Sequence, residues 1–174
     1  NSGSIAARGS LLLQSGNLRN LGGQLSADTV VALAQQDIEN LGGQIAADSA
    51  LLLQAGRDVR MASTTTEGSA RTDGSGLQTR YALTEVDRQA SVHVSGKNSR
   101  DIGDGTGGGL MLIQAGRDLS LQGTAVRNDG PGSTELAAGR DLEIGTTTTG
   151  SQIDAQWQSR RSRTSVQIEQ TTEH

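Results

Sequence analysis

Apolar residues occur along this chain in short runs that alternate with polar residues, and the pattern returns about every 20 positions. Residues 11–28 (LLLQSGNLRNLGGQLSAD) match residues 31–48 (VALAQQDIENLGGQIAAD), and Leu11 then aligns with Val31. ALLLQAGRDVRM at 50–61 matches LMLIQAGRDLSL at 110–121, and TELAAGRDLEI follows at 134–144. The runs are too short for helices, and their period of two predicts β-strands.

A unit of about 20 residues cannot bury its own apolar face, so such units must stack. If each strand pairs with its equivalent in the next unit, the apolar positions form a continuous buried column. The pattern therefore predicts an all-β fold, a parallel β-solenoid of about five or six rungs. Leucine-rich repeats have partly similar spacing. We prefer the solenoid because the consensus asparagine of those repeats does not recur and no helix of three turns fits inside the unit.

Two segments interrupt the repeat, and each predicts a β-hairpin excursion from the solenoid. In residues 62–108, two runs of opposite parity flank a turn expected at Thr84-Glu85. Residues 145–174 begin with a similar threonine run and predict a second, C-terminal hairpin with a basic turn. The first arm of the first hairpin contains Leu77, Thr79, Tyr81 and Leu83, and the second contains Val86, Arg88, Ala90, Val92 and Val94. We expect residues 1–174 to be a single solenoid fragment of a longer array.

The composition limits which residues can form the core and which classes of partner the chain can bind. Phe is absent, and Tyr81 and Trp157 are the only aromatic residues, so the core must consist of thin aliphatic layers. The net charge of −4, with both signs interspersed, argues against nucleic acid and anionic membrane as partners. No apolar run approaches the length of a membrane span. The absence of cysteine excludes disulfides, thiol catalysis and Cys-ligated zinc.

The tripeptide Gly-Arg-Asp occurs three times and predicts a structural corner. Glycine would supply a positive φ, and aspartate would accept backbone N–H groups at the turn. The alternative is a row of catalytic carboxylates, as in polysaccharide-cleaving β-helices. Two earlier corners carry Gly16-Asn17 and Gln36-Asp37, and asparagine can cap a turn but cannot act as a catalytic acid, so we prefer the structural interpretation. The predicted corner residues are Gly56, Asp58, Gly116, Asp118, Gly139 and Asp141.

Other motifs do not support catalytic, cofactor or metal sites. The glycine-rich stretch 103–109 lacks the helix and lysine of a phosphate loop and the oxygen set of a calcium site. His93 is expected on the polar face of the first hairpin, and His174 is terminal, so they make no metal-ligand pair. The strongest candidate for a partner contact is Trp157 with a nearby basic turn, which could bind a glycan or sulfated polysaccharide through stacking and charge. In the alternative, Trp157 only packs its own hairpin. The candidate contact residues are Trp157, Arg160, Arg161, Arg163 and Tyr81.

The LxAGRDLxL rung, the LGGQI/L rung and the threonine-rich segment after AGRD resemble the haemagglutinin repeats of filamentous haemagglutinin-like proteins. These are large exoproteins of two-partner secretion in Gram-negative bacteria, and they include adhesins and contact-dependent growth inhibition effectors. The resemblance implies a right-handed parallel β-helix and an extended stalk. It also implies secretion through an outer-membrane transporter, display on the bacterial cell surface, and a receptor or glycan partner on a host or neighbouring cell.

The predicted function is a structural and adhesive stalk segment, a role in cell adhesion and virulence, without enzymatic activity or cofactor. Two alternatives stay open. The chain could be a repeat segment of a contact-dependent inhibition effector that helps to deliver a toxin. It could also be a β-helix enzyme acting on polysaccharides, which would need an acidic cluster in a long groove.

Overall fold

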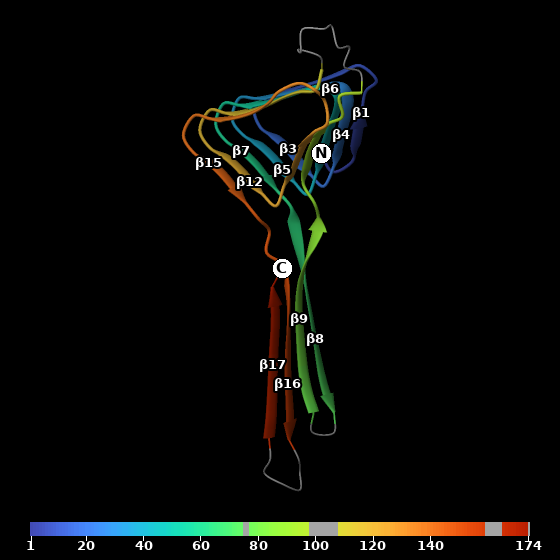
Figure 1. Ribbon diagram of the computed structural model, residues 1–174, viewed down its shortest axis with the longest axis vertical. Helices are drawn as coiled ribbons and strands as arrows, with labels where there is room; N and C mark the ends of the chain where they lie inside the picture. The colour runs from blue at the N-terminus through green and yellow to red at the C-terminus, as the bar shows by residue number, and fades with distance from the viewer. Residues whose placement is uncertain (75–76, 98–107, 159–164, 174) are drawn as a thin grey trace. The chain divides into compact units, whose positions relative to one another are not determined.

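The structure is a computed structural model that describes residues 1–74, 77–97, 108–158 and 165–173 (Figure 1). It divides into two units. Unit 1 comprises Asn1–Thr64 and Arg88–Thr146, and unit 2 comprises Thr65–Asp87 and Thr147–His174. Every regular element in the described ranges is a β-strand.

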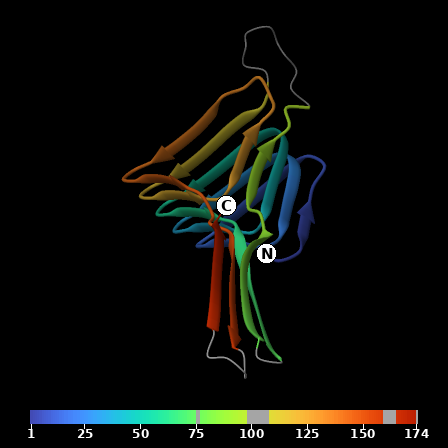
Figure 2. The ribbon, with the colours of Figure 1, turned by 60° about the horizontal axis from the view of Figure 1, so that its bottom comes forward.

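Unit 1 contains three rows of parallel strands, which the chain visits in turn (Figure 2). Row I is formed by β2 (Ser10–Ser15), the second halves of β4 (Gln24–Ala34) and β6 (Gln44–Ala55), β11 (Leu110–Ala115) and β14 (Thr134–Ala138). Row II is formed by β3 (Leu18–Leu21), β5 (Ile38–Leu41), β7 (Val59–Ala62), β12 (Leu119–Gln122) and β15 (Leu142–Gly145). Row III is formed by β1 (Ser4–Ala6), the first halves of β4 and β6, β10 (Ser91–Val94) and β13 (Ala125–Asn128). The predicted all-β class with parallel strand pairing is confirmed.

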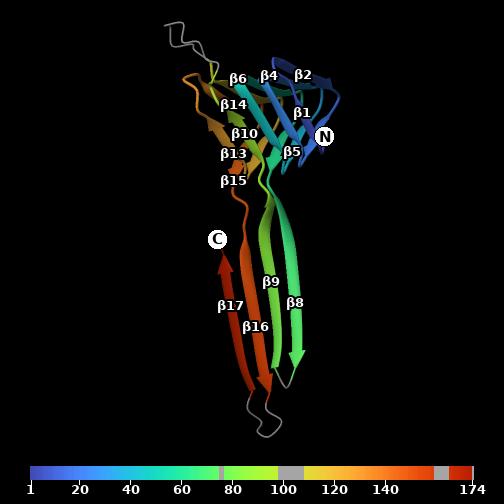
Figure 3. The ribbon, with the colours of Figure 1, turned by 90° about the vertical axis from the view of Figure 1, so that its right-hand side faces the viewer.

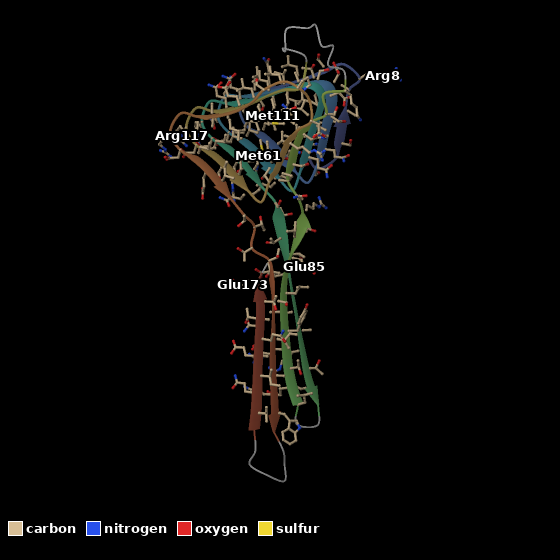
Figure 4. The ribbon with its side chains drawn as sticks, in the orientation of Figure 1. Arg8, Met61, Glu85, Met111, Arg117 and Glu173 are labelled. Atoms are coloured by element: carbon tan, nitrogen blue, oxygen red, sulfur yellow. The ribbon has the colours of Figure 1, made fainter. Side chains whose placement is uncertain are left out.

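Equivalent apolar residues of successive repeats pair in register, which buries them. Leu51 of β6 lies between Val30 of β4 and Met111 of β11, and all three are at most 1% exposed. Inward side chains from the three rows form one hydrophobic cluster. Met61 and Met111 are labelled in this cluster in Figure 4. Aliphatic layers thus provide the core without any aromatic residue.

Strand β2 is shifted by one residue from the predicted register. Leu11 pairs with Val30 rather than with Val31, whereas Leu18 pairs with Ile38 as aligned. The corner between β2 and β3 contains two residues, whereas the corner between β4 and β5 contains three. The missing residue changes which side of β2 faces the core, so the alignment at a constant offset was wrong there.

Unit 2 is a four-stranded sheet in the order β17-β16-β9-β8, as Figure 3 shows. Its strands are β8 (Thr64–Gly74), β9 (Leu77–Arg88), β16 (Gly150–Gln158) and β17 (Ser165–Glu173). β16 pairs antiparallel with both β9 and β17. β16 therefore joins two segments of unit 2 that are far apart in the sequence.

The turn predicted at Thr84-Glu85 is wrong, because both residues lie inside the continuous strand β9. The change of parity near this point was interpreted as a turn, but an exposed strand tolerates such a change because neither face has to fit a core. Val92 and Val94, assigned to the hairpin, instead belong to β10 and are fully buried in row III. Val92 pairs with Ile45 and Val126.

Candidate functional site

The Gly-Arg-Asp corners join row I to row II, and their glycines are required by close packing. A Cβ atom at Gly116 would lie 2.2 Å from the carbonyl oxygen of Gly56, and one at Gly139 would lie 2.2 Å from that of Gly116. None of the three corner glycines has a positive φ, so the predicted conformational reason was wrong. The corners stack so closely that any side chain at this position would overlap the backbone of the preceding repeat.

The corner between β4 and β5 has Gln35 at the position that glycine occupies in the later corners. The N–H of Gln35 donates to the carbonyl of Ser15, and the next N–H, of Gln36, donates to that of Gly16. In the later corners an additional carbonyl lies between the two acceptors, for example that of Gly56 between Ala55 and Arg57. The two-residue corner after β2 lacks this carbonyl, so Gln35 has room for a side chain.

Asp58 and Asp118 each bind the arginine of the next corner, whereas Asp141 pairs with Arg140 of its own corner at 3.2 Å. Asp58 accepts from Arg117 Nε at 3.1 Å and Nη2 at 2.6 Å, and from the backbone N–H of Asp118 at 3.4 Å. Asp118 likewise accepts from Arg140 Nε at 2.8 Å. Arg117 is labelled in Figure 4. These aspartates and arginines form a series of ion pairs, each of which joins one repeat to the next.

The pKa shifts of Asp58 and Arg117 are those expected of a structural ion pair. The hydrogen bond from Arg117 is the main cause that lowers the pKa of Asp58, and the N–H of Asp118 and the positive charges of Arg117 and Arg57 act in the same direction. The carboxylate of Asp58 in turn raises the pKa of Arg117. A general acid needs a carboxyl pKa raised toward the working pH. The geometry at Asp58 therefore favours the corner interpretation over a catalytic one.

Two buried asparagines were missed by the sequence interpretation. Asn20 and Asn40 are fully buried in row II. Asn20 donates to Asn40 Oδ1 at 2.8 Å, and each asparagine also donates at 2.9 Å to the carbonyl three residues later, that of Gly23 or Gly43. The signal was present as N-L-G-G-Q, which occurs twice with the same spacing. Buried amides need such partners, so this ladder fixes the register of the first repeats.

The second corner, Leu-Gly-Gly-Gln, does use glycine for conformation. Gly22 and Gly42 have φ values of 68° and 61°. A Cβ at Gly22 would also lie 2.0 Å from Arg88 Nη1, and one at Gly42 would lie 2.8 Å from Arg88 Cβ. Arg88 belongs to unit 1 although it is the last residue of β9, and it therefore packs across two glycine corners within its own unit.

Trp157 and Tyr81 lie on the same face of the unit 2 sheet. Trp157 pairs with Leu77 and Val166, and Tyr81 pairs with Ile153, so these side chains share one side. This apolar face is exposed to solvent. Its exposed fractions are 43% for Trp157, 46% for Leu77, 39% for Ile153, 49% for Val166 and 61% for Ile168.

The opposite face of the same sheet is polar. Gln78 pairs with Gln156, which pairs with Gln167, and Arg80 pairs with Asp154, which pairs with Glu169. These six side chains line a shallow depression of about 320 Å³. The sheet of unit 2 is thus amphipathic, with the aromatic residues on its apolar side.

The remaining predicted residues are placed as follows. Arg160, Arg161 and Arg163 lie outside the described residues. His93 lies in β10 of row III, and not in a hairpin, with its Nε2 atom 3.0 Å from Asp129 Oδ2. Hydrogen bonds from Arg127 first and His93 second lower the pKa of Asp129.

Within the described ranges, no group of three His, Cys, Asp or Glu side chains is arranged to hold a metal ion. The same part of the chain has no helix long and apolar enough to cross a lipid bilayer. Comparison with known proteins finds no matching family model, no curated protein of significantly similar sequence and no solved structure of significantly similar fold.

Proposed function

We propose that this chain is a structural and adhesive stalk segment of a filamentous haemagglutinin-like exoprotein. In this proposal, unit 1 is a right-handed parallel β-helix of about five or six rungs, secreted through an outer-membrane transporter and displayed on the surface of a Gram-negative bacterium. The observation that carries it is the stacking of equivalent residues in register, with an Asp–Arg contact from each Gly-Arg-Asp corner to the next.

The stacking supports a mechanical role. Each repeat adds about 4.8 Å along the stacking direction, so length grows in proportion to repeat number. Pulling two repeats apart would break parallel backbone hydrogen bonds in all three rows and an ion pair at the corner. It would also expose aliphatic layers that are fully buried, such as that of Leu53 and Ile113. Repetition of one contact thus gives a stiff rod.

The apolar face of unit 2 supports the adhesive part of the proposal. Exposed apolar patches of this kind on a soluble protein mark interaction sites. Trp157 and Tyr81 present ring surfaces and polar tips, a combination that suits contact with the faces and hydroxyl groups of sugars. The proposed partner is therefore a receptor or glycan on a host or neighbouring cell.

The test is a binding assay with beads that carry the whole chain, applied to epithelial cells, to neighbouring bacteria and to a glycan array. We expect binding by the wild type and at least tenfold weaker binding by Trp157→Ala. Gln156→Ala, the adjacent residue on the polar face, is the matched control and should bind as the wild type does. No binding by the wild type to any of the three, or equal binding by Trp157→Ala, would contradict the adhesive role.

A further inference from the structure

The outer face of row I carries a column of aliphatic side chains. Successive residues of a strand point alternately to the two sides of its sheet. Leu51 and Leu53 of β6 are buried in the core, so Leu52 between them points outward. The strands of row I pair in register, and the outward residues in line with Leu52 are Leu12 of β2, Val31 of β4 and Leu112 of β11. Leu12 is 59% exposed, and the other three are partly exposed.

Rows II and III have more polar outer faces than row I. The outward column that lies between the core residues of row II consists of Arg19, Glu39, Arg60, Ser120 and Glu143. The corresponding column of row III contains Ser26, Ala46, His93 and Arg127. In the described part of the chain, no outward column of these two rows is aliphatic in four successive repeats. All three rows pair in parallel, so pairing alone does not require the leucines of row I, and an exposed apolar patch of this kind marks an interaction surface.

Polar residues border the aliphatic column. The next outward position along the strands carries Gln14, Leu33, Gln54 and Gln114, and the three glutamines are exposed. The preceding outward position carries Ser10, Thr29, Ala50 and Leu110. An apolar centre with polar positions around it is the composition of a protein–protein interface. We propose that the outer face of row I, from β2 to β11, binds the same face of a second copy of this chain.

A second copy fits this face better than a sugar or a membrane does. The central column contains no aromatic ring and no hydrogen-bonding side chain, which contacts with sugars require. No Lys or Arg occupies an outward position in the described strands of row I, and Glu135 follows Leu112 in the column, so the face lacks the cations that bind anionic lipid headgroups. The side chains recur at the strand spacing of about 4.8 Å, and the same face of another copy repeats at that spacing.

A twofold axis along the strands, midway between β4 and β6, makes the face self-complementary. It brings Leu12 of one copy onto Leu112 of the other and Val31 onto Leu52, so each contact occurs twice. The glutamine column meets its own equivalent, and amides pair because each one both donates and accepts. Glu135 then lies beyond the four matched repeats. An axis along the stacking direction would instead place Glu135 against Glu135, and these like charges would repel, so the two copies run antiparallel.

The area of the face predicts a weak, reversible dimer. Four strands about 4.8 Å apart and six residues long, at about 3.3 Å per residue, present about 400 Å² per copy and about 800 Å² for the pair. Stable complexes bury about 1,200–2,000 Å². The dissociation constant is therefore expected in the micromolar to millimolar range. Repeats stacked on either end of unit 1 would lengthen this face without covering it.

The test uses two variants whose charges meet only in the proposed arrangement. Val31→Lys and Leu52→Glu each put an unpaired charge into the contact, and burial of such a charge opposes docking. In an equimolar mixture, the introduced ammonium and carboxylate groups pair across the interface, while the second contact between these positions stays aliphatic. Ile168→Lys, at a residue of β17 that is 61% exposed, is the matched control for charge. Far-UV circular dichroism checks folding, and Leu112→Lys with Leu12→Glu replaces the pair if either variant unfolds.

Sedimentation velocity up to millimolar concentration gives the result. The wild type and Ile168→Lys should dimerise equally, each single variant in row I should dimerise at least tenfold more weakly, and the mixture should recover dimers.

Four outcomes would overturn the proposal. A wild type that stays monomeric would show that the face does not associate. Undiminished association of either single variant would assign the contact to another surface, strand edges included. A mixture that does not recover dimers would reject the antiparallel arrangement, and loss of association by Ile168→Lys would place the contact in unit 2.

Discussion

Because the corners stack so closely, we predict that Gly116→Ala destabilises the protein. The new Cβ would lie 2.2 Å from the carbonyl oxygen of Gly56, a separation that real Cβ atoms do not reach, so two corners must move apart. Such overpacking costs about 1–3 kcal/mol. The movement also strains the hydrogen bonds from Gly116 to Ala55 and from Arg117 to Arg57, which measure 2.9 and 2.8 Å.

A Gly→Ala substitution also stabilises a protein by about 0.4–1 kcal/mol, because it restricts the unfolded chain. The net effect expected for Gly116→Ala is therefore a loss of about 0–2.6 kcal/mol, centred near about 1.3 kcal/mol, or a fall of roughly 0.5–1 M in the urea midpoint. Gly16→Ala is the matched control, because it lies in the corner after β2 with nothing within 4 Å of the new Cβ and no positive φ. We expect it to be neutral or slightly stabilising.

The assay is urea unfolding followed by far-UV circular dichroism, with Trp157 fluorescence recorded in parallel. Trp157 and Tyr81 are the only aromatic residues and both belong to unit 2, so fluorescence reports on that unit while dichroism reports on both. Equal midpoints for the two variants would refute the close-approach explanation. A larger loss for Gly16→Ala than for Gly116→Ala would have the same consequence.

Three further predictions concern burial and charge. Asn40→Ala should cost about 1–3 kcal/mol in a thermal melt, because it leaves buried polar partners unsatisfied. Asp58→Asn should be less stable than the wild type at neutral pH, and the difference should vanish in acid. Because the pKa of Asp58 is lowered in the folded state, its contribution is present above the ordinary aspartate pKa of 3.8 and is lost as the pH falls through the folded-state pKa. Val92→Ala should cost about 2 kcal/mol because Val92 is fully buried, whereas Val86→Ala, at a residue 43% exposed, should change stability by less than about 0.5 kcal/mol.

The boundaries of the interruption could not be read from the pattern. Val86, Arg88, Ala90, Val92 and Val94 alternate as one strand would, yet β9 ends at Arg88 and β10 begins at Ser91. A period of two is common to an exposed strand and to one buried on one face, so alternation alone does not show where the chain returns to the core.

The repeat by itself determined the all-β class, the parallel pairing and the position of the corners, because apolar residues that recur every 20 or so positions can be buried only by stacking. The tertiary structure decided why the corner residues are what they are. Gly56 is glycine because the carbonyl of Gln35 lies against it, and Asp58 is aspartate because Arg117 and the N–H of Asp118 approach it from the next repeat. Both reasons lie about 20 to 60 residues away along the chain. A sequence displays a repeated tripeptide, but only the stacked backbone shows which neighbour each of its atoms meets.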